Sequence, residues 1–206
     1  METTATHHAD LHRDDDASKI GMWLFIFTEI LLFGGLFIVY SVYRFRNPVA
    51  FHIAHEELSI SMGLINTIIL LISSATVAIS ISAIQKNDRK LSLMMLGLTL
   101  LLALTFLVNK YFEWGAKFEH GMYPGSELMK MLSNGDMLFF SLYFFMTGLH
   151  AVHIIVGMIL LAVSMAKVSS GAIHSTRFVL LENSGLYWHL VDLIWIFLFP
   201  LFYLIH

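Results

Sequence analysis

The stretch IGMWLFIFTEILLFGGLFIVYSVY, residues 20–43, has 24 residues and a single charged side chain, Glu29. A bilayer hydrocarbon core requires about 20 predominantly apolar residues per helix, so this stretch is long enough to cross one. It differs from a secretory signal because it is too long and because acidic residues, Asp14, Asp15 and Asp16, precede it. The stretch therefore predicts a transmembrane helix that carries a carboxyl group.

Four further apolar stretches have the length of a membrane span, in a chain of 206 residues that is 57% hydrophobic. They are residues 59–84, 91–112, 137–166 and 187–205. Because lipid offers no hydrogen bonds to the backbone, each stretch is expected to be helical. The sequence predicts an all-α, polytopic membrane protein: five transmembrane helices form one bundle over residues 20–206, after a flexible polar tail at residues 1–19.

Composition excludes several classes of site and partner. The chain has no cysteine, so it can form neither disulfides nor thiolate metal sites. A formal net charge of −3 gives no reason to expect a nucleic-acid partner. The tail histidines, His7, His8 and His12, are expected to be solvated rather than metal-bound.

The orientation follows from Lys and Arg residues near the helix ends, which favour the cytoplasmic side. Seven lie on the side of the N-terminus, in the tail and in the connections at residues 85–90 and 167–186. The other side has five. The predicted topology therefore has a cytoplasmic N-terminus and a C-terminus outside, in a bacterial inner membrane. The connection at residues 113–136 should lie on the outer surface, with a short amphipathic piece at residues 127–132.

Small and weakly polar residues predict where the helices pack against each other. In the second span they form one stripe, which is expected to face protein: Ser59, Gly63, Asn66, Ser73 and Ser80. Pro200 is expected to kink the last helix near its outer end. Aromatic residues at the expected membrane borders, Trp114, Tyr187 and Trp188, are interpreted as interfacial anchors.

Glu29 is the most unusual residue of the first span. At about 1.5 Å per residue it lies roughly 13 Å from Ile20 along the helix. A charged side chain in the middle of a membrane helix costs about 2.5–3.5 kcal/mol on insertion scales. We therefore expect Glu29 to be protonated, or to have a partner or water inside the protein.

Two other pairs of polar residues lie in the last two spans: His150 with His153, and His189 with Asp192. Each pair has the spacing i, i+3, which predicts that both members face the same way. Structural hydrogen bonding, with lipid headgroup contacts near Glu182 and His189, is the favoured interpretation. A proton relay and a metal site are alternatives. A repeated ligand set such as Glu-x-x-His is missing from the sequence, so no metal is expected.

Four segments together resemble subunit III of the haem–copper terminal oxidases, the cytochrome c oxidase and quinol oxidase subunit 3 family. They are KIGMWLFIFTEILLFGGLF (residues 19–37), INTIILLISSATV (65–77), FFMTGLHAVHIIVGMILL (144–161) and LENSGLYWHLVDLIWIFLFPLFYL (181–204). They occur in the family's order. The resemblance extends from about residue 19 to the C-terminus, and it is to the five-helix form of the family.

The resemblance implies a noncatalytic accessory subunit of an oxidase that reduces oxygen to water and translocates protons. Haems and copper are then expected in the partner subunits and not in this chain, with catalytic subunit I, and also subunits II and IV, as partners. Bound phospholipid is expected between the helices. The matching polar positions are Glu29, Asn66, His150, His153, Glu182, His189, Asp192 and Trp195. None of them is expected to be catalytic.

Three alternatives remain open from the sequence. The first is a similar accessory protein of nitric oxide reduction, and the second is an ion-coupled transporter that uses Glu29 and Asp192. The third is a membrane enzyme with iron on His150, His153 and His189. The electron donor, cytochrome c or a quinol, is not determined by this chain.

Overall fold

The computed structural model describes residues 2–131 and 133–204, with side chains from residue 15 onward except that of Lys130. The described residues form helices and no β-strand. In chain order the helices are α1 (Glu2–Arg46), α2 (Pro48–Glu56), α3 (Ile60–Gln85), α4 (Arg89–Glu119), α5 (Glu127–Met131), α6 (Asn134–Ser170) and α7 (Val179–Tyr203).

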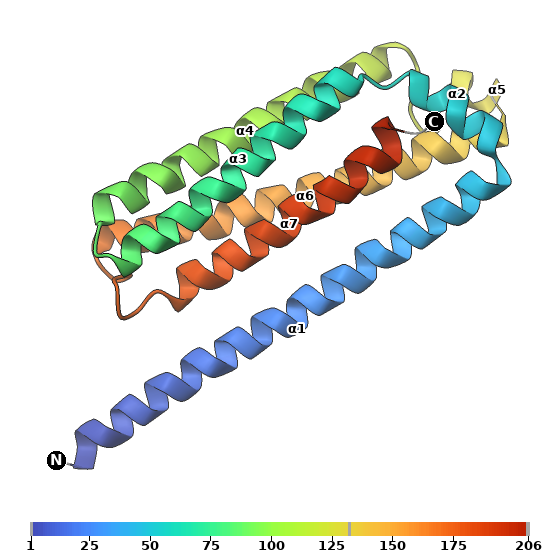
Figure 1. Cartoon of the computed structure of the whole chain (residues 1–206). Coiled ribbons are helices and arrows are strands. Elements are labelled where there is room, and N and C mark those ends of the chain that lie inside the picture. The colour runs from blue at the N-terminus through green and yellow to red at the C-terminus, as the bar shows by residue number, and fades with distance from the viewer. Residues whose placement is uncertain (1, 132, 205–206) are drawn as a thin grey trace.

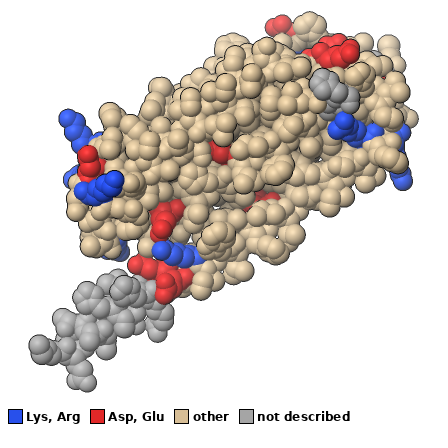
Figure 2. Space-filling view, in the orientation of Figure 1, with Lys and Arg blue, Asp and Glu red and all other residues tan. Residues whose placement is uncertain are grey.

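Five of these helices are long and apolar enough to cross a membrane: α1, α3, α4, α6 and α7. The prediction of an all-α, polytopic membrane protein is therefore confirmed. The charged residues visible in Figure 2 gather at the two ends of the molecule, and the long surface between them is almost free of charge. That surface matches the hydrocarbon layer of a bilayer.

Helices α3, α4, α6 and α7 form a four-helix bundle, and α1 lies along its outside against α6 and α7 (Figure 1). The α3–α4 and α6–α7 connections lie at one end of the bundle, and α2 and α5 lie at the other. Burial follows this arrangement. In the 18-residue apolar segment of α7, 56% of the residues are buried, whereas in that of α1 only 11% are.

The small-residue stripe of α3 faces protein, as the sequence predicts. Gly63, Asn66, Ser73 and Ser80 are buried, and Ser59 instead caps the start of the helix. Ser80 Oγ lies 2.8 Å from Ser92 Oγ of α4. Small side chains let two helices approach closely, and hydroxyl pairs then bond across the contact.

The helices are longer than the apolar stretches suggest. A boundary is expected between the tail and the first span. Helix α1 instead begins at Glu2 and runs without a break through residue 19 into the span. The tail histidines lie outside the described side chains, and the flexibility of the tail stays a prediction. Helix α4 continues to Glu119, and α5 coincides with the expected short piece.

Helix α7 begins at Val179, before the apolar stretch at residues 187–205 and within the residues 167–186 expected to form a connection. Tyr187 and Trp188 are consequently not interfacial anchors. Their exposed fractions are 2% and 0%, and the indole of Trp188 donates to Ser73 Oγ at 3.1 Å inside the bundle. Trp114 is half-buried and packs against Phe144.

Candidate functional site

Glu29 and His153 form the polar contact between α1 and α6. His153 Nε2 lies 3.0 Å from Glu29 Oε2, and both side chains are nearly buried, with exposed fractions of 12% and 13%. The other ring nitrogen of His153 lies 2.7 Å from the carbonyl oxygen of Leu149, and Phe33 packs edge-on against the imidazole. The membrane carboxyl group therefore has a protein partner in the neighbouring helix.

The part of α1 around Lys19 is held by two polar contacts to α7. Lys19 Nζ lies 3.0 Å from Glu182 Oε2, and Asn183 Nδ2 donates to Ser18 Oγ at 2.9 Å. The Lys19–Glu182 pair is partly exposed, as expected at a membrane surface, where such pairs contribute little stability. The pair marks the place where α1 lies beside α7.

The C-terminal part of α1 is held by Tyr40, whose hydroxyl donates to the backbone carbonyl of Leu201 in α7. Between its ends, α1 buries a stripe of residues spaced by seven, Ile26, Phe33 and Tyr40. This narrow stripe is typical of a helix that contacts its neighbours along a single seam. Most of the remaining surface of α1 is left for lipid or another protein.

His150 does not share the environment of His153. It is fully buried, and its ring packs against Phe106 of α4 and Trp195 of α7 with centroid distances of 5.6 and 5.1 Å. Neither ring nitrogen has a hydrogen-bond partner within the described part of the chain. The i, i+3 spacing leaves the two positions about 60° apart around the helix, and within this shared side of α6 the two rings reach different neighbours.

His189 and Asp192 of α7 face α3. His189 Nδ1 lies 2.6 Å from Ser74 Oγ, and Ser74 is also a polar neighbour of Asp192. Asp192 is buried, with an exposed fraction of 3%, and neither carboxyl oxygen has a partner of normal hydrogen-bond geometry among the residues described.

Asn66 and Trp195 join the same interior. Asn66 Oδ1 accepts a hydrogen bond from Asn109 Nδ2 at 2.9 Å, and the Trp195 indole donates to Thr67 Oγ1 at 3.1 Å. Both residues are fully buried. These contacts connect α3 with α4 and α7, so the positions marked by the family resemblance lie at helix interfaces.

The three histidines considered as iron ligands do not converge. His150 contacts aromatic rings, His153 contacts Glu29, and His189 contacts Ser74. Across residues 15–204, apart from the undescribed side chains, no three His, Asp or Glu residues are grouped as metal ligands. The metalloenzyme alternative therefore has no support from the geometry.

A buried charge cluster is the feature that sequence reasoning missed. Lys110 Nζ lies 3.1 Å from Glu113 Oε2, and the exposed fractions of these side chains are 3% and 5%. Tyr143 of α6 and Tyr203 of α7 complete the cluster. The sequence placed Lys110 at the membrane border and Glu113 in a loop. The signal that could have revealed them is their i, i+3 spacing within a helix that continues to Glu119.

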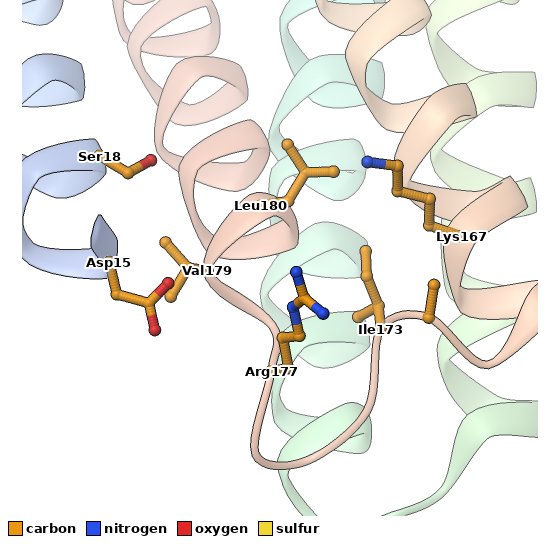
Figure 3. A pocket seen from close by; sticks show the side chains of 8 residues that line it. Asp15, Ser18, Lys167, Ile173, Arg177, Val179 and Leu180 are labelled. Atoms are coloured by element: carbon orange, nitrogen blue, oxygen red, sulfur yellow. The ribbon is translucent and has the colours of Figure 1, made fainter. Parts of the chain in front are cut away.

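A pocket of about 290 Å³ opens at the end of the bundle that carries the α6–α7 connection. Lys167 and Arg177 line it from the end of α6 and from the connection, and Asp15 and Ser18 line it from α1 (Figure 3). Lys167 and Arg177 give the pocket two cationic side chains and Asp15 gives it one anionic side chain. A small anionic group is the ligand that this charge balance favours.

The fold and these contacts define an integral membrane protein with five spanning helices and a polar interior built from helix-to-helix contacts. The sequence matches the family described as Cytochrome c oxidase subunit III over residues 2–206. The chain belongs to this family, and the predicted resemblance is confirmed.

Three relatives illustrate the family. The "Probable quinol oxidase subunit 3" of Staphylococcus saprophyticus is 29% identical over 93% of this chain and 90% of that protein. The "Cytochrome c oxidase subunit 3" of Yarrowia lipolytica is 32% identical over 90% of this chain and 66% of that protein. The "Heme-copper oxidase subunit I+III" of Aeropyrum pernix is 30% identical over 92% of this chain, which spans only 23% of that protein.

Proposed function

We propose that this chain is the accessory subunit III of a haem–copper respiratory oxidase, without a catalytic centre of its own. The observation that carries this proposal is the family match over residues 2–206. The role is to stabilise the catalytic subunit during oxygen reduction coupled to proton translocation. The haems and copper are held by the partner subunits.

The partner is catalytic subunit I, with subunits II and IV in the same complex. Support for the first partner comes from the Aeropyrum pernix relative, whose name joins subunits I and III in a single chain. Helix α1 is suited to such a contact because its own chain covers so little of it. The membrane is a bacterial inner membrane, with the N-terminus on the cytoplasmic side.

The pocket beside Lys167 and Arg177 supports the second part of the proposal, a bound anionic phospholipid. Basic pockets between membrane helices on the cytoplasmic side suit phosphate headgroups. In the predicted orientation this pocket opens on that side, beside the Lys19–Glu182 pair. The headgroup is therefore assigned to Lys167 and Arg177 rather than to Glu182 and His189, which have protein partners.

Gentle purification from the native membrane tests the assignment to an oxidase. We expect subunit I to co-purify and the visible spectrum to show haem. Co-purification with a nitric oxide reductase would favour that alternative instead. Solute movement by the isolated chain in liposomes would contradict an accessory role.

Lipid binding is tested by mass spectrometry of lipids retained in the purified complex. The double variant Lys167→Ala/Arg177→Ala should lose most of the anionic phospholipid that the unmodified complex retains. Lys86→Ala/Lys90→Ala removes two exposed cations at the same end of the bundle and serves as the control. Equal lipid retention in all three complexes would contradict the proposed headgroup site.

A further inference from the structure

The cluster of Lys110, Glu113, Tyr143 and Tyr203 brings together α4, α6 and the last residue of α7. We infer that these four residues act as one electrostatic unit that locks the last turn of α7 onto α4 and α6. We call this unit the polar lock. It is a conformational device at the end of the bundle opposite to the α6–α7 connection.

The polar lock satisfies its own hydrogen bonds. Lys110 Nζ donates to Glu113 Oε2 at 3.1 Å and to the hydroxyl oxygens of Tyr143 and Tyr203 at 3.0 Å each. Both hydroxyls donate in turn to Glu113 Oε1, that of Tyr143 at 2.5 Å. An ammonium group has three donors, and all three are used here. The unit is neutral overall, which is the condition for burying charges in an apolar interior.

Aromatic rings surround the ammonium group in addition to its hydrogen bonds. Lys110 Nζ lies 5.4 Å from the ring centre of Trp195 and 6.0 Å from that of Trp114. Cations are attracted to aromatic faces at such distances, and more strongly when both are shielded from water. Trp195 also packs against His150, so the polar lock is continuous with the buried core of the bundle.

The last turn of α7 needs such a restraint because its backbone is poorly bonded. Pro200 has no N–H to donate to the carbonyl of Ile196, and the last carbonyls of any helix lack partners within it. Side-chain contacts with other helices restrain this turn in place of backbone hydrogen bonds. Tyr40 of α1 donates to the Leu201 carbonyl, and Tyr203 enters the polar lock. The last turn of α7 is therefore a point where α1, α4 and α6 meet.

Removing one charge of the polar lock should destabilise the last turn of α7 more than removing both charges together. A single loss leaves a buried charge without its partner. The double replacement removes both charges and leaves the hydroxyls of Tyr143 and Tyr203, which lie 3.4 Å apart and can bond each other. The variants Lys110→Met and Glu113→Leu, alone and combined, separate these cases. Tyr203→Phe is the mildest variant, because it removes one hydroxyl and keeps the ring.

The experiment is hydrogen–deuterium exchange of the assembled oxidase complex, read on peptides that cover the last turn of α7. Tyr203→Phe should speed exchange there at least about tenfold, because it removes two hydrogen bonds to charged groups, one from Lys110 and one to Glu113. Exchange near residues 184–192 should stay unchanged. Tyr111→Phe removes the hydroxyl of an exposed tyrosine on α4 and is the matched control.

The double variant Lys110→Met/Glu113→Leu should exchange more slowly than either single variant. If the effects of the two single variants on the exchange rate simply added in the double variant, the idea of one electrostatic unit would be overturned. Unchanged exchange of the last turn in Tyr203→Phe would overturn the lock itself. If the charge variants do not accumulate in the membrane, the exchange measured for Tyr203→Phe alone tests the polar lock.

Discussion

Glu29 is placed in a membrane helix because another helix supplies its partner. The carboxyl group lies 3.0 Å from His153 Nε2, so it does not face lipid without a hydrogen bond. A neutral carboxylic acid and a carboxylate can both make this contact. The structural role of Glu29 therefore requires a hydrogen-bonding group of its size rather than a charge.

Replacing Glu29 by Gln should largely preserve assembly, because an amide keeps a hydrogen bond to His153. Glu29→Leu should cost about 1–3 kcal/mol, since it leaves the nearly buried imidazole nitrogen without a partner. Thermal unfolding and subunit retention of the purified complex measure the difference. Loss of all turnover in a fully assembled Glu29→Gln complex would instead indicate a catalytic proton role.

At this scale the sequence reveals Glu29 but not Lys110 and Glu113. Glu29 is conspicuous because it is the single charged residue of the stretch at residues 20–43. Lys110 and Glu113 lie where an apolar stretch ends, which is also the normal place for surface charges. Their burial depends on Tyr143 and Tyr203, which come from two distant parts of the chain.

Between elements, hydroxyl pairs bind α3 to α4 inside the bundle. Ser80 Oγ contacts Ser92 Oγ at 2.8 Å, and Thr76 Oγ1 contacts Thr99 Oγ1 at 2.7 Å. Ser80→Ala should lower the free energy of unfolding by about 0.6 kcal/mol, the usual size of such bonds in membranes. Ser41→Ala, in which an exposed hydroxyl bonds only its own helix, should have no effect. Equal losses in both variants, measured by reversible unfolding in detergent, would contradict this difference.

The contact between α6 and α7 depends on a glycine. A Cβ at Gly157 would lie 2.8 Å from the Trp188 ring, closer than real Cβ atoms approach. Gly157→Ala should destabilise the bundle by about 1–3 kcal/mol through overpacking, less what alanine gains in helix propensity. Gly97→Ala is the control, because its nearest contact would be an ordinary 3.8 Å. A raised unfolding temperature in Gly157→Ala would show that Trp188 can move freely.

The existence of the five spanning helices could be predicted from the sequence, whereas their ends could not. Hydropathy marks the part of a helix that lies in lipid, and α7 begins before that part. Its first turns carry Glu182 and Asn183, whose polarity ends the apolar stretch. Lys19 and Ser18 of α1 contact them there, and a contact between distant parts of the chain leaves no mark in the hydropathy of the sequence.

For the whole molecule, the absence of cysteine makes the topology directly testable. Thr176→Cys in the α6–α7 connection should react with a membrane-impermeant thiol reagent only from the cytoplasmic side. His120→Cys, just after α4, should react only from the outside. Labelling of intact cells and of inverted vesicles measures both, and the reverse pattern would contradict the predicted orientation.

The number of spanning helices could be predicted from the sequence, but their arrangement in the bundle could not. Apolar periodicity does not tell a lipid-facing side from a protein-facing side, because both are apolar. The stripe of α3 was predicted only because its residues are small and polar. The position of α1 outside the other four helices depends on contacts with residues more than a hundred positions away.

The separation of Glu29 from His153 by 124 residues has a consequence for biosynthesis. Ribosomes add roughly 5–20 residues per second, so Glu29 is synthesised roughly 6–25 s before His153. During that interval the nascent first helix holds an unmatched acid in lipid. We expect it to remain near the insertion machinery, or beside an already inserted oxidase chain, until the rest of the polypeptide arrives.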